Sequence, residues 1–209
     1  MSSERENPPH PSQNQSDPVF DNQPPPATIK HTYTFEPTLA EYNKPLDEIL
    51  SANAPRDRIG VGAFVFKGDN AANRQLLLIR RSANEAAFPK MYEVPGGGAE
   101  APPIDATLLD SVARELFEET GLVATRITRL IGTSDFEGRR GDKWRKFSFE
   151  VHVEDTARIV LQPAEHDQFI WIGFEEFKKE LDLGEQGLLW NSMPAQVGRI
   201  RAAFEHFES

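Results

Sequence analysis

Three glutamates near the middle of the chain combine a residue type and a spacing that could do chemistry: Glu115, Glu118 and Glu119. Residues three and four positions apart lie side by side on one face of a helix, so a helix here would gather the three carboxylates. Like charges repel unless a cation neutralises them, and Mg²⁺ commonly bridges carboxylates to substrate phosphates. The glycine-rich stretch 94–100 lets backbone approach an ion or a phosphate closely. The pattern predicts a metal-dependent enzyme that acts on a phosphate anhydride.

The stretch 114–122 reads R-E-L-F-E-E-T-G-L and resembles the second half of the Nudix box. The pattern of that box is G-x5-E-x7-R-E-U-x-E-E-x-G-U, where U is an aliphatic residue, and every specified position of the second half is present. The first half departs from the pattern. Eight residues before Arg114 the chain has Ala106 where the box has glutamate, and taking Gly97 as the glycine of the box leaves three extra residues.

The extra residues lie in the stretch 101–106, which contains Pro102 and Pro103. Two adjacent prolines suit a lengthened loop before the helix, because a proline inside a helix removes a backbone hydrogen bond. Glu100 and Asp105 are both candidates for the carboxylate that the first half lacks, and the sequence does not decide between them.

The resemblance implies roles for the residues of the box. Glu115, Glu118 and Glu119, together with the carbonyl of Gly96, would hold Mg²⁺ or Mn²⁺, and the metal would lower the pKa of an attacking water. Glu118 and Glu115 are the candidates within the box for the general base that takes the proton of that water. Arg114 would orient a ligating carboxylate through its bidentate guanidinium, although an ordinary ion pair on a helix surface is the plainer alternative.

Residues outside the box complete the predicted site. Glu165, which precedes His166, resembles the acidic residue with which many Nudix proteins approach the metal from a late strand, so it is a candidate extra ligand or base. The plainer interpretation is a loop glutamate at a strand entrance, and His166 is expected to be structural. Arg80 could contact substrate phosphates, and Phe136 and Trp144 could stack on a base. The plainer interpretations are that Arg80 is a solvated surface charge and that Phe136 and Trp144 are rings of the hydrophobic core.

Composition divides the chain into three parts. Residues 1–27 are rich in Pro, Ser, Asn and Gln and cannot bury enough apolar surface to offset the entropy of ordering, which predicts a disordered tail. Residues 28–56 are expected to form an N-terminal extension that packs on the domain, with an edge strand at 28–35 and a short helix within 38–52. Residues 57–209 are expected to form the Nudix hydrolase domain.

Hydrophobic patterning predicts the elements that must position the site. Helix 107–120 should carry the glutamates, because Thr107 and Asp110 form an acidic variant of the capping box and Gly121 suits the helix end. Its apolar stripe, formed by Leu109, Val112 and Leu116, should lie nearly opposite the glutamates. Further helices are expected at 174–183 and 194–207, strands at 59–66, 75–80, 92–94, 123–132, 144–153 and 169–172, and a polar loop at 135–143. With the resemblance, this order implies an α/β fold, a Nudix-type α/β/α sandwich with a mixed β-sheet.

Composition also excludes several classes of protein. The absence of cysteine excludes disulfides, thiolate zinc sites and cysteine nucleophiles. The formal net charge of −10 argues against non-specific binding of duplex nucleic acid, although not against a small-molecule nucleotide substrate. Apolar runs of membrane-spanning length and a signal peptide are absent, so we expect a cytoplasmic protein without membrane contact.

The leading prediction is a metal-dependent hydrolase that cleaves the pyrophosphate bond of a nucleoside diphosphate linked to another moiety. The alternative is a catalytically inactive Nudix-fold module that binds nucleotides or regulates a partner, which the altered first half of the box would suit. A third possibility is a structural protein whose glutamates are merely solvated. The sequence leaves open the leaving moiety, the oligomeric state and the role of the tail.

Overall fold

The computed structural model describes residues 32–53, 55–138, 140–189 and 194–206. The predicted tail at 1–27 and the first residues of the predicted edge strand lie outside this part of the chain. In the part that is described, no helix is both long enough and apolar enough to cross a membrane.

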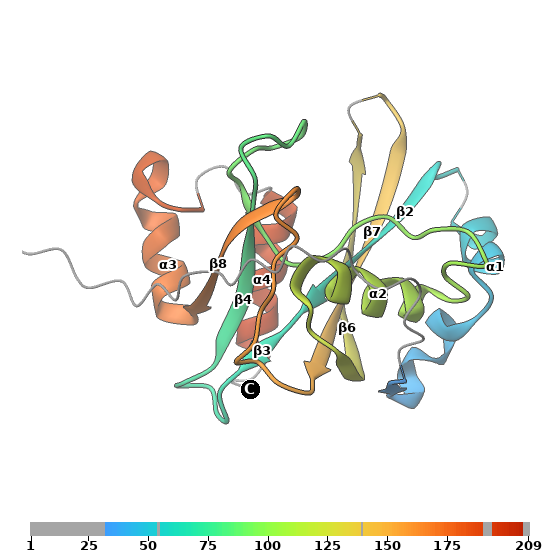
Figure 1. Ribbon diagram of the computed structural model, residues 1–209, viewed down its shortest axis with the longest axis horizontal. Coiled ribbons are helices and arrows are strands. Elements are labelled where there is room, and N and C mark those ends of the chain that lie inside the picture. Colours follow the sequence, from blue (N-terminus) through green and yellow to red (C-terminus); the bar gives the residue numbers. More distant parts are fainter. Residues whose placement is uncertain (1–31, 54, 139, 190–193, 207–209) are drawn as a thin grey trace, which may run out of the picture.

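In the described part of the chain, eight strands form two sheets of four strands each. Figure 1 shows how the sheets and helices are arranged. In the first sheet the order is β1 (Thr34–Phe35), β6 (Ala124–Glu137), β7 (Lys143–Val153) and β2 (Arg58–Phe64). The second sheet contains β3 (Phe66–Lys67), β4 (Gln75–Arg81) and β5 (Tyr92–Glu93), with β8 (His166–Gly173) paired to β4. The first sheet is mixed, because β1 and β2 run parallel to their partners while β6 and β7 are antiparallel.

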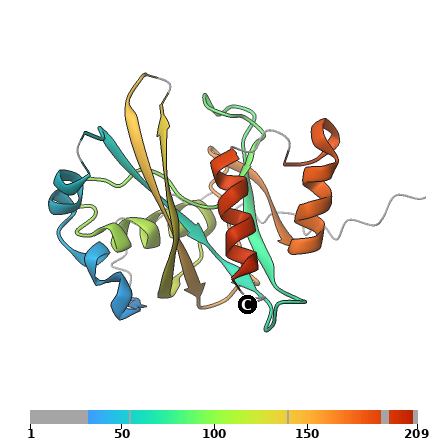
Figure 2. The same ribbon diagram turned by 180° about the vertical axis from the view of Figure 1, so that it is seen from behind.

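The helices cover these sheets from opposite sides. They are α1 (Leu46–Ala52), α2 (Leu108–Thr120), α3 (Phe174–Asp182) and α4 (Pro194–Glu205), with short 3₁₀ helices η1 (Pro37–Asn43) and η2 (Gly184–Gln186). Figure 1 shows α2 in front of the strands, and Figure 2, from behind, shows α4 in front of them. The predicted α/β/α sandwich is confirmed, although its strands form two sheets and not one.

Strand β4 shows why the chain needs helices on both sides. Successive side chains of a strand point to opposite faces. Leu77 and Ile79 belong to the hydrophobic core around α2, whereas Leu76 and Leu78 belong to the core that α3 and α4 cover. All four side chains are fully buried. A strand that is apolar on both faces therefore lies at the centre of the sandwich.

Helix α2 begins and ends where its sequence predicts. The hydroxyl of Thr107 accepts a hydrogen bond from the amide of Asp110 at 3.1 Å, and the Asp110 carboxylate accepts one from the amide of Thr107 at 3.0 Å. At the other end Gly121 adopts a φ of 69°, in the left-handed region that favours glycine. The predicted apolar stripe is fully buried and consists of Leu109, Val112 and Leu116. Burial of this stripe leaves the opposite edge of α2 for the glutamates.

The predicted loop at 135–143 is too long, because residues 135–137 and 143 belong to strands. Strand β6 runs to Glu137 and β7 begins at Lys143, so residues 138–142 lie between the two strands. Cross-strand pairs explain the extension, because Asp135 forms an ion pair with Arg145 at 2.7 Å and Phe136 stacks on Trp144. Polar side chains suggested a loop, but here they stabilise an exposed hairpin.

The predicted strand at 59–66 divides between the two sheets. Strand β2 ends at Phe64, and the chain enters the second sheet at β3 after Val65. The carbonyl of Val65 accepts a hydrogen bond from the amide of Leu77 at 2.9 Å, which joins this transition to β4. A continuous apolar run therefore serves both sheets, a division that hydrophobicity alone does not reveal.

Residues 33–53 form a strap across the first sheet and α2, and we call them the N-terminal strap. Strand β1 lies parallel to β6, and η1 and α1 follow on either side of Pro45. Leu39, Leu46 and Ile49 are buried in the same core as the apolar stripe of α2. The strap thus contributes three apolar side chains to the core that holds α2.

Candidate active site

The glycine-rich loop before α2 is held along β2 by its backbone. The carbonyls of Pro95 and Gly97 accept hydrogen bonds from amides of β2 at 2.7 and 2.9 Å. A Cβ on Gly96, whose φ is 147°, would lie 2.2 Å from the carbonyl oxygen of Val61. Glycine is therefore required at this position, both by its conformation and by its close approach to β2.

The same loop contacts two of the box glutamates from its other side. The amide of Gly96 donates a hydrogen bond to Glu119 Oε2 at 2.6 Å. A Cβ on Gly97 would lie 2.5 Å from Glu115 Oε2, so the absence of a side chain there makes room for this carboxylate. The loop and the helix together enclose Glu115 and Glu119.

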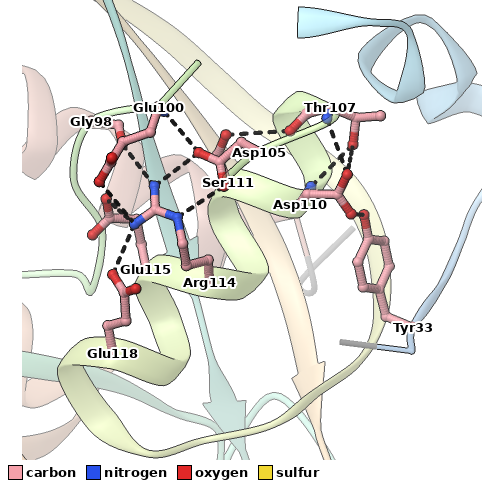
Figure 3. Close-up of polar contacts among 10 residues, drawn as sticks. All are labelled: Tyr33, Gly98, Glu100, Asp105, Thr107, Asp110, Ser111, Arg114, Glu115 and Glu118. Carbon is pink, nitrogen blue, oxygen red and sulfur yellow. Dashed lines mark hydrogen bonds and ion pairs between the residues drawn. The ribbon is translucent and has the colours of Figure 1, made fainter. Parts of the chain in front are cut away.

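Arg114 uses all five of its N–H donors within the site (Figure 3). Its Nε and Nη2 bind the two carboxylate oxygens of Asp105 at 2.8 and 2.9 Å, and Nη2 also donates to the carbonyl of Gly98 at 3.0 Å. Its Nη1 donates to Glu115 at 3.0 Å and to Glu118 at 2.8 Å. One guanidinium therefore joins the loop before the helix to two of the predicted metal ligands.

Asp105 occupies the position opposite Arg114 that the sequence left open. Its side chain is 1% exposed and forms a bidentate ion pair with Arg114, whereas the side chain of Glu100 is 53% exposed and lies 3.8 Å away. The backbone amide of Glu100 also donates to Asp105 at 2.8 Å. Burial would raise the pKa of Asp105, but the hydrogen bonds from Arg114 and from this amide lower it below its ordinary value of 3.8.

Residues of β5 and β8 close the other side of the site. His166 is fully buried, and its Nε2 lies 3.7 Å from Glu93 and 3.8 Å from Glu119. Neither ring nitrogen of His166 has a hydrogen-bond partner in the described part of the chain. One ligand atom each from Glu119, Glu165 and His166 lie within 4.8 Å of one another. The structure therefore brings the predicted Glu165 to the box, and His166 with it.

Burial and mutual repulsion dominate the electrostatics of these carboxylates. Burial, helped by the charge of Glu118, raises the pKa of Glu115 to about 7 despite Arg114. Burial and the charges of Glu93 and Glu115 raise the pKa of Glu119 well above its ordinary value. A divalent cation would relieve this repulsion, and a set of carboxylate oxygens suits a hard cation. The residues present therefore fit a divalent metal.

Glu93 belongs to the same site, although its sequence position did not single it out. Burial would raise its pKa, but His166, Lys146 and Arg81 lower it to about 2. Arg81 Nη1 donates to Glu93 at 2.7 Å. The only signal in the sequence is that Glu93 ends the short strand that leads into the glycine loop, and this signal does not specify a role.

The three predicted substrate-binding residues occupy different places. Phe136 and Trp144 stack with 5.8 Å between their ring centroids, and a Cβ on Gly98 would lie 3.6 Å from the Trp144 ring. This pair therefore adjoins the glycine loop. Arg80 instead forms an ion pair with Asp167 at 2.7 Å, with its guanidinium over the Tyr92 ring, and its described contacts include none of the box glutamates.

Comparison with known proteins agrees with the predicted family. The model of the NUDIX domain matches residues 56–189. An RNA pyrophosphohydrolase of Bartonella bacilliformis is 30% identical over 136 residues, which cover 56% of this chain and 78% of that relative. The m7GpppN-mRNA hydrolase NUDT17 of Danio rerio is 48% identical over 52 residues. That match covers 25% of this chain and only 16% of the relative.

Two solved structures share the fold. A MutT protein from Methanosarcina mazei Go1 is 27% identical with a TM-score of 0.51, and the match covers 72% of this chain and 92% of that one. The NUDIX domain of Shewanella oneidensis NrtR, solved with ADP ribose, has a TM-score of 0.54 at 20% identity over 77% of this chain and 97% of that one.

The fold and the glutamate-bearing helix define a hydrolase class, and the chain belongs to the Nudix family. The comparisons thus confirm the predicted family, whose members here include a relative named RNA pyrophosphohydrolase.

We predict that Asp105→Asn lowers the free energy of unfolding at pH 7 by about 2 kcal/mol, the usual worth of hydrogen bonds to a charged group. Because the folded pKa of Asp105 is depressed, its contribution is fully present above the ordinary pKa of 3.8 and is lost as pH falls through the folded value. The difference in the free energy of unfolding between the native protein and Asp105→Asn, measured in urea, should therefore shrink below about pH 4.

The matched control is Asp69→Asn, which changes an exposed turn residue and should shift the free energy of unfolding by no more than about 0.5 kcal/mol. Equal losses in the two variants, constant across pH, would contradict a structural role for the Asp105–Arg114 pair.

Proposed function

We propose that this protein is a divalent-metal-dependent hydrolase that cleaves the pyrophosphate bond of a nucleoside diphosphate linked to another moiety. The observation that carries the proposal is the enclosure of Glu115 and Glu119 between α2 and the glycine loop, with the pKa of each carboxyl raised. A fold gains no stability from repelling carboxylates, so their arrangement favours a cation as part of the functional state.

Glu115, Glu118 and Glu119 would hold Mg²⁺ or Mn²⁺, and the carbonyl of Gly96 would be a further ligand. The carbonyls on either side of Gly96 are bonded to β2, and the Gly96 amide is directed to Glu119, which supports this assignment. When bound, the metal would offset phosphate charge and lower the pKa of an attacking water. Arg114 would keep Glu115 and Glu118 in position for it.

The general base is best sought among the carboxylates that reach solvent. The side chain of Glu118 is 45% exposed, and Glu165 is also exposed, whereas Glu115 is enclosed against Gly97. A base must lie within hydrogen-bond reach of the water that it activates. This geometry favours Glu118 or Glu165 as the base and leaves Glu115 to ligation.

The names of the relatives and the rim of the site support a nucleoside-containing substrate. The Bartonella relative is named for a pyrophosphate bond of RNA, and the Danio relative for a capped mRNA. Phe136 and Trp144 form a half-buried pair of rings beside the glycine loop, and such a pair offers a surface on which a base can stack. We assign the pair to the base and the carboxylates to the phosphates.

We predict that Glu118→Gln abolishes hydrolysis while the fold is retained, because Glu118 is half-exposed and glutamine keeps its size. The assay measures product release from ADP-ribose, a nucleotide sugar, a dinucleoside polyphosphate and capped or triphosphorylated RNA oligonucleotides, each with Mg²⁺ or Mn²⁺. Glu154→Gln, the same change at an exposed position after β7, is the control and should retain full activity.

Turnover that survives in Glu118→Gln would refute the assigned role of this glutamate. A native protein that binds metal and nucleotide but releases no product from any of these substrates would instead identify an inactive Nudix-fold binding module.

We also predict that Mn²⁺ raises the melting temperature of the native protein, because a ligand that binds only the folded state at a hundred times its Kd contributes about 2.7 kcal/mol. Glu119→Gln removes a ligand and a source of repulsion. The metal-free variant should therefore melt no lower than the native protein, and it should lose most of the response to Mn²⁺. An undiminished response in scanning calorimetry would exclude Glu119 as a ligand.

For the aromatic pair, we predict that Trp144→Ala raises KM about tenfold with little change in kcat, because stacking of a base on an aromatic ring is worth about 1–3 kcal/mol. Trp144→Phe keeps an aromatic face and should recover most of the loss. Steady-state kinetics on the best substrate of the panel measure both. A fall in kcat with unchanged KM would contradict a role in binding the base.

A further inference from the structure

The lengthened loop before α2 is exposed, yet it ends in a buried carboxylate that pairs with Arg114. Residues 100–104 are exposed, and the side chain of Ile104 extends into solvent. The next residue, Asp105, is nonetheless buried and must meet the guanidinium of Arg114 with both carboxylate oxygens. Extra residues in an exposed loop enlarge the set of conformations open to it. Contacts from elsewhere in the chain therefore have to hold the end of this loop.

The N-terminal strap supplies these contacts at the two residues that follow Asp105. The amide of Leu46 donates a hydrogen bond to the carbonyl of Ala106 at 3.0 Å. Pro45 and Thr107 form an isolated antiparallel bridge. The backbone of the strap thus pairs with the loop just before α2 begins.

Tyr33 adds a side-chain contact to the first turn of α2 (Figure 3). Its hydroxyl donates to Asp110 Oδ1 at 2.7 Å, and Oδ2 of the same carboxylate accepts from the amide and the hydroxyl of Thr107 at 3.0 and 2.9 Å. Burial and the neighbouring Asp110 raise the pKa of Tyr33, so its hydroxyl remains a donor. Tyr33 therefore binds the carboxylate that caps the helix of the box.

The strap itself is anchored in the core. Leu39, Leu46 and Ile49 are buried there, and the Tyr42 ring contacts those of Phe147 and Phe149 with centroids 5.7 and 5.3 Å apart. This packing restricts the backbone of the strap, so Tyr33 and Leu46 can hold the loop in one position.

We propose that the N-terminal strap is a positioning element of the active site and that Tyr33 is its positioning residue. Through Asp110 and Thr107 the strap fixes the start of α2 and the end of the lengthened loop, so that Asp105 holds Arg114 and Arg114 holds Glu115 and Glu118. The effect on catalysis rests on the proposed function, whereas the effect on the helix start and on metal binding does not.

The test compares Tyr33→Phe with Tyr42→Phe in the full chain. Both changes remove one phenolic oxygen from the strap, but only Tyr33 contacts the capping residues of α2. For Tyr33→Phe we expect Mn²⁺ to bind several-fold more weakly by calorimetry and kcat to fall by a similar factor. This is less than the roughly tenfold or greater loss that follows removal of a direct partner of a metal ligand, because Tyr33 acts through Asp110 and the loop. KM and the far-ultraviolet spectrum should change little, and Tyr42→Phe should match the native protein.

Hydrogen exchange separates this proposal from the proposed function. In Tyr33→Phe the amides of the first turn of α2 should exchange about tenfold faster, while those of β4 should keep their protection. Faster exchange and weaker Mn²⁺ binding in a protein that turns over no substrate would support the strap and reject the hydrolase. Native exchange rates and native Mn²⁺ affinity in Tyr33→Phe would overturn the role of Tyr33, whatever the activity.

Discussion

The buried ion pair between Arg114 and Asp105 is the interaction on which the site depends. Asp105 is buried and accepts hydrogen bonds from Arg114 with both carboxylate oxygens, so the two residues constrain each other strongly. Their contact fixes the end of the loop to the middle of α2. The remaining donors of Arg114 then hold Gly98, Glu115 and Glu118, so the same pair that stabilises the fold also sets the geometry of the predicted ligands.

The carboxylates of the site fall into two groups that are held by different hydrogen-bond donors. Arg114 donates hydrogen bonds to Glu115 and Glu118. The amide of Gly96 donates one to Glu119, which also lies beside His166. Glu93, kept ionised by its cationic neighbours, adds to the repulsion that raises the pKa of Glu119. The packing of α2 against the sheets keeps these charges together despite that repulsion. Structure and electrostatics thus favour the same conclusion, that a cation completes the site.

Local signals made part of this site predictable. The capping pair of Thr107 and Asp110, the apolar stripe and the helix end at Gly121 all depend on neighbours within one or two turns, and the sequence predicted each of them. Long-range pairing was not predictable in the same way. Whether Asp105 or Glu100 pairs with Arg114 depends on which of the two carboxylates the loop buries. The length of β6 depends on cross-strand partners such as Arg145. The ion pair of Arg80 with Asp167 likewise depends on the pairing of β4 with β8.

The altered half of the box and the N-terminal strap are best understood together. A longer loop has more conformations to lose on closure, so its last residues must be held if the loop is to bring a carboxylate to Arg114. The strap contacts Ala106 and Thr107, the residues between the loop and the helix, and Tyr33 contacts the cap itself. Support from outside the domain's own motif therefore holds Asp105 against Arg114, one residue before the position where the usual spacing places a glutamate. The departure from the pattern is, in physical terms, compatible with an intact site because another part of the chain limits the conformations of the loop.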